Sequence, residues 1–181
     1  MDTYKIKFTI LQEEILRLLG IKAGEKLSQR QIAKLLDVSG TAVGTSVHDL
    51  EKAGLILKET QGTMNLNFIT LNRDNKRAMQ LKRAENLKLI YECGFADILE
   101  EEFPGATIIL FGSFSRGDDT SASDIDIAII GRKEKEINLE KFEKLLERKI
   151  NINSYSALKD VHKDLRENIC NGIVLVGGIQ L

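Results

Sequence analysis

Apolar and polar residues alternate with two different periods over the first 71 residues. Several stretches repeat apolar side chains every three to four positions, which predicts helices that pack on one face. Ser28 and Gln31 form the capping-box pattern that starts a helix, and Gly20 and Gly54 stand where helices are expected to end. In chain order, the pattern predicts helices over residues 10–19, 29–36 and 41–53, then strands over residues 55–58 and 65–71 joined through Gly62.

The second half of the chain carries short apolar runs, polar loops and one amphipathic segment. Residues 107–111 predict a buried strand, and a polar loop leads from it into a second apolar strand with Asp124 and Asp126. Residues 139–146 have helical spacing, and residues 149–155 predict a further strand. This alternation of strands with helices favours an α/β domain.

Asp124 and Asp126 are the polar residues that say most about function. Because side chains alternate along a strand, both carboxylates are expected on one face while Ile125 and Ile127 point into the core. Two like charges held that close repel each other unless a cation lies between them. Oxygen ligands suit a hard divalent ion such as Mg²⁺, which commonly binds together with substrate phosphates. The alternative is an acidic turn that caps a strand with both carboxylates in solvent.

The polar loop before this strand has the features of a phosphate site. Gly112 would let the backbone approach a phosphate closely, and Ser113 offers a hydroxyl and a main-chain N–H. Gly117 supplies a second unrestricted turn position, and Arg116 would neutralise phosphate charge. Together with the acidic pair, the loop predicts a nucleotide-binding site.

These residues resemble a known family. Gly112-Ser113, ten further residues and Asp124-Ile-Asp126 are similar to the signature of minimal nucleotidyltransferases in the DNA polymerase β-like superfamily. The resemblance runs from about Phe95 to Leu181 and includes the Ser-Arg-Gly turn and Ser123. It implies an α/β domain with a mixed sheet.

The resemblance also implies a reaction. Such enzymes bind a nucleoside triphosphate with Mg²⁺ or Mn²⁺, let a hydroxyl attack the α-phosphate and release pyrophosphate. Asp124 and Asp126 would be catalytic residues and metal ligands. Gly112, Ser113, Arg116 and Ser123 would bind the nucleotide, for which ATP is expected.

One position departs from the family pattern. A third carboxylate is expected on the next strand, between apolar neighbours, and Asn151 stands there. An asparagine oxygen can ligate Mg²⁺, but it brings no negative charge and cannot act as a general base. Asn151 is therefore the third candidate catalytic residue, and its identity puts catalysis in doubt while nucleotide binding is less affected. Asn151 as a strand-end residue without a role in the site stays open.

The first half of the chain has a resemblance of its own. The stretches Leu27-Ser-Gln-Arg-Gln-Ile-Ala and Leu50-Glu-Lys-Ala-Gly-Leu-Ile are similar to winged helix-turn-helix domains of transcriptional regulators, over residues 8–71. The resemblance implies that double-stranded DNA is the partner. The recognition helix would present four residues to a major groove: Thr41, Thr45, Ser46 and His48.

A second role for this domain stays open. Winged helices also serve as dimerisation or protein-docking modules, so a homodimer is the alternative assembly. Residues 1–71 carry nine Lys/Arg against eight Asp/Glu, which is a weak positive charge for a dedicated DNA binder.

The charge distribution favours a division of the chain. Residues 72–92 carry six Lys/Arg against three Asp/Glu, and residues 93–181 carry eleven against sixteen. We expect a winged helix-turn-helix domain over residues 1–71, a basic linker helix over residues 72–92 and a nucleotidyltransferase domain over residues 93–181. The basic residues of the linker are read as a solvated face, with phosphate contacts or an acidic partner as the alternative.

Cys93 and Cys170 lie far apart and lack metal-type spacing, so they are read as reduced, buried thiols of a cytoplasmic protein. No signal peptide or membrane-spanning run is recognised, so no membrane partner is expected.

The sequence thus predicts an α+β two-domain protein. The leading hypothesis is transfer of a nucleoside monophosphate, AMP from ATP, to a hydroxyl acceptor, coupled to a DNA-binding winged helix. The resemblance extends to antitoxins that adenylylate a HEPN-type ribonuclease toxin, which makes such a toxin the candidate partner protein. The competing hypothesis is a transcription regulator whose nucleotidyltransferase fold senses a nucleotide without turning it over.

Overall fold

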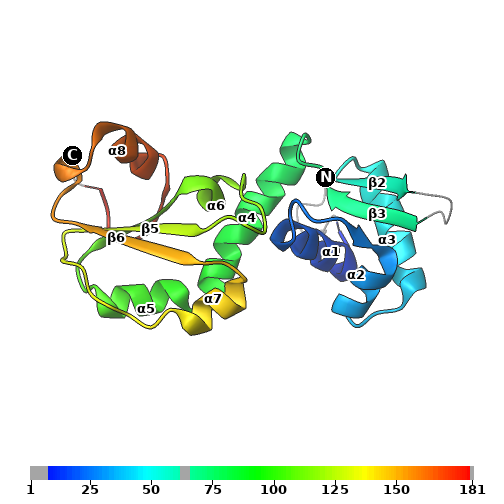
Figure 1. Cartoon of the computed structure of the whole chain (residues 1–181), viewed down its shortest axis with the longest axis horizontal. Helices are drawn as coiled ribbons and strands as arrows, with labels where there is room; N and C mark the ends of the chain where they lie inside the picture. The colour runs from blue at the N-terminus through cyan, green and yellow to red at the C-terminus, as the bar shows by residue number, and fades with distance from the viewer. Residues whose placement is uncertain (1–7, 62–65, 180–181) are drawn as a thin grey trace, which may run out of the picture. The chain divides into compact units, whose positions relative to one another are not determined.

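The computed structural model describes residues 8–61 and 66–179 (Figure 1). The chain divides into two compact units, of which the first ends at Lys82 and the second begins at Arg83. The boundary falls inside α4 (Lys76–Glu92), in the segment predicted as a basic linker helix. Gly62, the predicted hairpin connection, lies outside the described residues.

The first unit is a small α/β domain in which, among the described residues before α4, three helices pack with a three-stranded antiparallel sheet in the order β1-β3-β2. Its helices and strands are close to those predicted, apart from the two-residue β1, which was too short to be expected. In chain order the elements are α1 (Ile10–Ile21), β1 (Leu27–Ser28), α2 (Gln29–Leu35), α3 (Gly40–Lys52), β2 (Ile56–Gln61) and β3 (Leu66–Leu71).

Local sequence explains where the helices of this unit begin. The hydroxyl of Ser28 accepts a hydrogen bond from the Gln31 N–H while the Gln31 side chain accepts one from the Ser28 N–H, so the predicted capping box is confirmed. Thr9 and Gln12 form the same arrangement at α1, and Ser39 caps α3. Such caps stabilise a helix by about 1 kcal/mol each. The apolar faces of α1, α2 and α3 then bury one core with the sheet.

The second unit contains a four-stranded sheet in the order β6-β5-β4-β7. Within the part of this unit that the structure describes, only β5 and β6 pair in parallel, so the predicted mixed sheet is confirmed. The elements after α4 are α5 (Phe95–Glu102), β4 (Thr107–Phe111), α6 (Gly112–Arg116), β5 (Ile125–Ile130), α7 (Glu140–Leu146), β6 (Ile150–Tyr155), the 3-10 helix η1 (Leu158–Asp160), α8 (Lys163–Cys170) and β7 (Ile173–Val176).

Helices cover both faces of this sheet (Figure 1). The side chains of α5 and α7 and the end of α4 join one core with one face of β4 and β5. Val161 and α8 form a smaller core with the opposite face. The strands β4 and β5 are therefore buried on both faces. The polar residues at the ends of these strands lie at the edge of the two cores.

The structure corrects three details of the sequence reading. The segment after β4 begins with the short helix α6 rather than a loop, because Gly112 leaves the strand at φ +75° and Gly117 ends the helix at φ +83°. The strand β5 begins at Ile125, so Asp124 directly precedes it. Cys170 is exposed and Cys93 is half-buried, so neither thiol is fully buried as expected.

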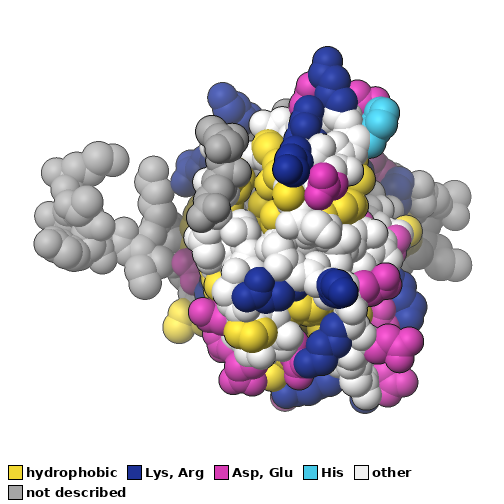
Figure 2. All heavy atoms as spheres, turned by 90° about the vertical axis from the view of Figure 1, so that its left-hand side faces the viewer, with side chains coloured by type: hydrophobic (Ala, Val, Ile, Leu, Met, Phe, Trp, Pro, Cys, Tyr) yellow, Lys and Arg dark blue, Asp and Glu magenta, His cyan; other side chains and the backbone are white. Residues whose placement is uncertain are grey.

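Charged side chains of both signs intermingle on the face shown in Figure 2, with apolar side chains between them. The acidic excess of residues 93–181 therefore does not form one patch on this face. Among residues 8–61 and 66–179, no helix combines the length and apolar character needed to cross a bilayer.

Candidate functional site

The sheet register brings the predicted site residues together. Asp126 pairs with Phe111 of β4 on one side and with Asn151 of β6 on the other. Gly112 follows Phe111 directly, and Asp124 lies two residues before Asp126. The glycine-serine turn, the acidic pair and Asn151 therefore meet at one edge of the sheet.

Asn151 contacts both carboxylates of the acidic pair. Its Nδ2 donates to Asp124 Oδ2 at 3.2 Å and to Asp126 Oδ1 at 3.3 Å. Ionised carboxylates only accept hydrogen bonds, so the amide has to turn its nitrogen toward them. The two hydrogens of one neutral amide thus reduce the repulsion between Asp124 and Asp126, a role that a cation would otherwise have.

Gly112 lies directly against the second carboxylate. A Cβ atom at Gly112 would stand 2.5 Å from Asp126 Oδ2, which is closer than real Cβ contacts. The positive φ of Gly112 is also a conformation that favours glycine. Close approach of backbone and carboxylate therefore requires glycine at this position.

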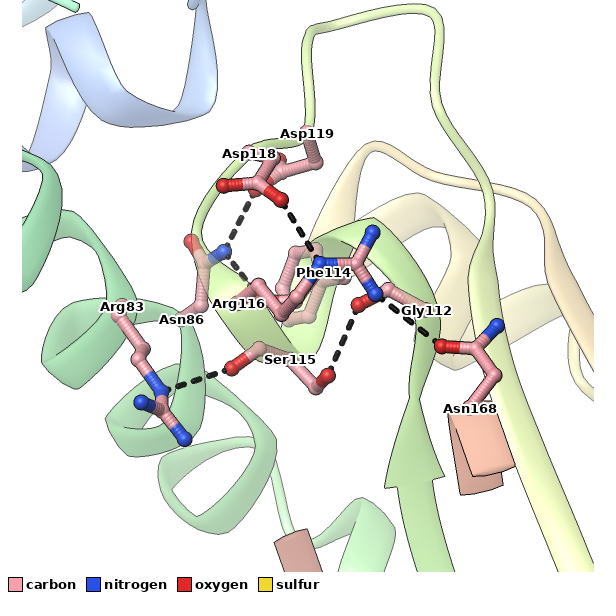
Figure 3. A network of polar contacts seen from close by, with 9 residues as sticks. All are labelled: Arg83, Asn86, Gly112, Phe114, Ser115, Arg116, Asp118, Asp119 and Asn168. Atoms are coloured by element: carbon pink, nitrogen blue, oxygen red, sulfur yellow. Dashed lines mark hydrogen bonds and ion pairs between the residues drawn. The ribbon is translucent and has the colours of Figure 1, made fainter. Parts of the chain in front are cut away.

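The other predicted nucleotide-binding residues make local contacts. Ser113 is half-buried at the start of α6, and its carbonyl accepts from the Asp118 N–H. The Ser123 hydroxyl accepts from the Thr120 N–H at 2.9 Å and closes the turn before Asp124. Arg116 is exposed and donates to Asp118 Oδ2 at 2.8 Å and to Asn168 Oδ1 at 3.1 Å (Figure 3).

The structure also contains a buried polar cluster that the sequence reading missed, formed by Asn86, Asp119 and Arg148. Asn86 Nδ2 donates to Asp119 Oδ1 at 2.7 Å and to the Phe114 carbonyl at 2.9 Å (Figure 3). Arg148 Nη2 lies 3.4 Å from Asp119 Oδ2. The sequence hints at this cluster only through Asn86, a polar residue that lies at helical spacing from the buried residues Ala78 and Ile90 of α4.

A pocket of about 470 Å³ opens beside Asp124, between residues 121–124, α7 and residues 147–149. On its wall the Glu143 carboxylate accepts from Lys149 Nζ at 2.9 Å and from the Ile150 N–H at 3.1 Å. The hydrogen bond from Lys149, and then the one from Ile150, lowers the pKa of Glu143. The hydrogen bond between Lys149 and Glu143 also raises the pKa of Lys149.

The donor set fits one divalent cation. Two carboxylates next to the glycine-serine turn supply hard oxygen ligands, and Mg²⁺ usually completes its shell with phosphate oxygens and water. Among residues 8–61 and 66–179, no group of three or more His, Cys, Asp or Glu side chains is arranged to hold a metal ion. The amide oxygen of Asn151 is the further ligand available here, after rotation of the amide.

The recognition helix α3 places its predicted DNA contacts on two sides. Thr41, Thr45 and His48 are exposed, whereas Ser46 is only 7% exposed and shares the buried face with Val43 and Val47. The expectation that Ser46 would reach a groove is therefore corrected, because helical spacing turns it toward the core.

Comparison with known proteins matches both parts of the chain to families. Residues 92–176 match the nucleotidyltransferase domain family, and residues 8–63 match the MarR family. A search of curated proteins returns no significant match.

Solved structures that resemble the chain include a repressor and a transcription regulator. The adhesin competence repressor AdcR of Streptococcus pyogenes is 21% identical, with 54% of this chain and 69% of that chain covered and a TM-score of 0.43. ZitR of Lactococcus lactis is 20% identical, with 57% and 67% covered and a TM-score of 0.43. MepR of Staphylococcus aureus in its complex with DNA is 23% identical, with 52% and 70% covered and a TM-score of 0.39.

The two family matches agree with the two folds described above, in the same order along the chain. The chain is therefore a fusion of a MarR-family winged helix domain with a nucleotidyltransferase domain.

Proposed function

We propose that the second domain binds a nucleoside triphosphate, with ATP as the expected substrate, through one Mg²⁺ or Mn²⁺ ion held by Asp124 and Asp126. It then transfers the nucleoside monophosphate to a hydroxyl acceptor. The observation that carries this proposal is the packing of Asp126 against Gly112, where any Cβ would collide with the carboxylate. A carboxylate that only needed solvation would not require such a contact.

The arrangement supports a division of tasks among the residues. The turn at Gly112 and Ser113 offers backbone N–H groups and a hydroxyl to phosphate oxygens, next to the carboxylates that would bind the cation. The bound ion supplies positive charge that offsets the charge of the phosphates. Asp124 and Asp126 would hold the ion beside the glycine-serine turn, at the edge of the sheet where the α-phosphate would lie.

The transfer step is a displacement at phosphorus. An acceptor hydroxyl oxygen forms a bond to the α-phosphorus, the bond from that phosphorus to the bridging oxygen breaks, and pyrophosphate leaves. Asn151 cannot take the hydroxyl proton, and we assign that proton to solvent. Because a positioned base contributes on the order of a hundredfold or more, transfer by this chain should be slow.

A second candidate function follows from the same asparagine. The two hydrogen bonds from Asn151 Nδ2 reduce the repulsion within the acidic pair without a metal ion. A site with that property can bind ATP and a cation reversibly while lacking the base for turnover. The chain would then be a transcription regulator that senses a nucleotide.

The winged helix domain is proposed to bind double-stranded DNA through the exposed face of α3. The match to the MarR family supports this role, as do the exposed hydroxyls of Thr41 and Thr45 beside His48. Contacts of this kind favour phosphates over bases, so affinity should depend strongly on salt. An operator upstream of its own gene is the first duplex to test, and a homodimer is the assembly to look for.

Transfer is tested with ATP labelled in the α-phosphate, Mg²⁺ or Mn²⁺, and the protein encoded by the neighbouring gene as acceptor, with a HEPN-type toxin as the leading choice. Label should move to the acceptor with the parent chain and not with Asp124→Asn/Asp126→Asn. ATP labelled in the γ-phosphate should leave the acceptor unlabelled. Cation-dependent ATP binding without any transfer would support the nucleotide-sensing function over the transferase function. Absence of ATP binding would rule out both functions.

A further inference from the structure

The buried cluster of Asn86, Asp119 and Arg148 connects the three segments that carry the candidate site. Phe114 lies two residues after Gly112 in α6, Asp119 lies five residues before Asp124, and Arg148 lies three residues before Asn151. The cluster therefore contacts each segment at a point two to five residues away from a candidate site residue. The contacts are drawn in Figure 3, apart from those of Arg148.

The cluster is almost fully buried. Asn86 is 4% exposed, Asp119 is 1% exposed and Arg148 is 5% exposed. The two oxygens of Asp119 accept from different elements, since Oδ1 faces Asn86 of α4 and Oδ2 faces Arg148 ahead of β6. A carboxylate bonded on both sides fixes the distance between those elements.

Stability is a weak reason for such a cluster. Taking a carboxylate and a guanidinium out of water is costly, and replacing a buried ion pair with apolar side chains is often neutral or stabilising. Hydrogen bonds inside a buried polar network instead restrict the arrangement of the segments that they join. Specific positioning is therefore the role that fits the observed contacts.

The second half of α4 also holds the end of α6. A helix of five residues leaves most of its carbonyl groups without helical partners. Asn86 donates to the Phe114 carbonyl, and Arg83 Nε donates to the Ser115 carbonyl at 3.0 Å (Figure 3). These two side chains come from residues ahead of the stretch that matches the nucleotidyltransferase family. The linker helix thus supplies contacts that the matched domain lacks.

We infer that Asn86, Asp119 and Arg148 are positioning residues that set the glycine-serine turn, the acidic pair and Asn151 in register for a cation-bound nucleotide. This inference rests on the proposed function, because it names what holds the same site together. None of the three residues is assigned contact with substrate.

The test replaces the ion pair with apolar side chains of similar size, as Asp119→Leu/Arg148→Met. If the pair only served the fold, this variant would bind ATP like the parent. If it positions the site, the melting temperature should stay within about 3 °C of the parent while the tightening of ATP binding by Mg²⁺ falls at least about fivefold. Glu102→Gln/Lys135→Gln, which removes an exposed ion pair of the same domain, is the matched control.

A second variant guards against misfolding of the first. Asn86→Ala removes the donor to both Phe114 and Asp119 and leaves the ion pair in place, so it should lose the same Mg²⁺-dependent tightening. Amide hydrogen exchange over residues 112–126, measured without ligand, should become faster in both variants and stay unchanged in the control.

The outcomes separate this inference from the proposed function. If the parent shows no tightening by Mg²⁺, the proposed function fails, and hydrogen exchange alone then decides whether the cluster positions residues 112–126. If exchange and Mg²⁺-dependent tightening are both unchanged in the folded variants, the positioning role is overturned.

Discussion

At the scale of single residues, Asn151 sets the charge of the candidate site. Its amide donates to both Asp124 and Asp126, which places a neutral donor where a third carboxylate would add a further negative charge. The apo site is then less strained, and a bound cation meets two negative charges instead of three. Asn151 therefore stabilises the empty site, and it should also weaken the binding of a metal ion and leave the site without a third carboxylate to act as base.

Asn151→Asp should reverse both effects. Two donated hydrogen bonds are replaced by a third like charge, so the metal-free protein should lose about 1 kcal/mol of unfolding free energy at neutral pH. Added Mg²⁺ should recover that loss, and any transfer activity should rise. Urea unfolding with and without Mg²⁺ measures the effect.

Asn153→Asp is the control for this substitution. Asn153 is also exposed on β6, two residues further along. Asn151 would not belong to the site if Asn153→Asp showed the same loss of unfolding free energy. The same conclusion would follow if Mg²⁺ did not change the stability of Asn151→Asp.

Gly112→Ala tests the contact between the turn and Asp126. The positive φ alone should cost about 1–2 kcal/mol, and the collision with Asp126 should add to that and displace the carboxylate. Gly131→Ala isolates the first effect, because Gly131 has φ +90° but nothing within 4 Å of its added Cβ. Calorimetric melting should show a larger loss for Gly112→Ala, and equal losses would refute the contact.

At the scale of elements, the connection between α7 and β6 is held by one carboxylate. Glu143 of α7 accepts from Lys149 and from the Ile150 N–H at the first residue of β6. Both groups precede Asn151 closely in the chain. The contact therefore ties the helix beside the pocket to the strand that carries the third site residue.

Glu143→Gln should lower stability at neutral pH and leave it unchanged in strong acid. The folded protein lowers the pKa of Glu143 from its ordinary value of 4.5, chiefly through Lys149, so the stabilisation is present above that value and disappears as the pH falls through the folded pKa. Unfolding measured from pH 7 down to pH 2 should show the parent and the variant converging. Glu100→Gln, an exposed residue of α5, should show no such difference, and a constant gap for Glu143→Gln would contradict the account.

Elements with a regular apolar period could be predicted from the sequence, and irregular ones could not. The helices α1, α2 and α3 and the strands β4 and β6 follow patterns local to their residues. The helix α6 is too short to show a period, and its helical start depends on the backbone angle of Gly112. The burial of Ser46 follows only when its hydroxyl is considered together with its buried neighbours Val43 and Val47.

The candidate site also contains residues that could be predicted from the sequence and residues that could not. Gly112, Ser113, Asp124 and Asp126 lie within 15 residues, so their spacing alone indicates shared chemistry. Asp119 and Arg148 are 29 residues apart, and their pairing depends on how the sheet brings β5 and β6 together. Contacts of that range leave no pattern in one sequence.

At the scale of the whole molecule, the chain combines a winged helix domain and a nucleotidyltransferase domain. The proposed functions of the two domains can be tested independently, because each rests on its own residues. Substitutions on α3 should change DNA binding without changing nucleotide binding. Substitutions at the acidic pair should change nucleotide binding without changing DNA binding, unless the domains communicate.

Thr45→Glu/His48→Glu should weaken duplex binding. Both side chains are exposed on α3, so two carboxylates would face the phosphates without disturbing the core. Ser46 is left unchanged because it is buried. Fluorescence anisotropy over a salt series should show parent affinity falling as salt rises and the variant weaker by about tenfold or more.

The control for DNA binding is Ser156→Glu, which adds a carboxylate to an exposed residue of the second domain. It should bind DNA as the parent does. No binding by the parent at low salt, with duplexes from upstream of its own gene, would instead favour the docking or dimerisation role of the winged helix.

The most direct measurement of the central claim is the calorimetric affinity for ATP with and without Mg²⁺, in the parent and in Asp124→Asn/Asp126→Asn. If the acidic pair shares a cation with the nucleotide, Mg²⁺ should tighten binding by about tenfold or more in the parent and by less than about twofold in the variant. The variant should stay folded, with metal-free stability equal to the parent or higher, because a repulsion has been removed. Equal ATP affinity with and without Mg²⁺ in the parent would contradict the account.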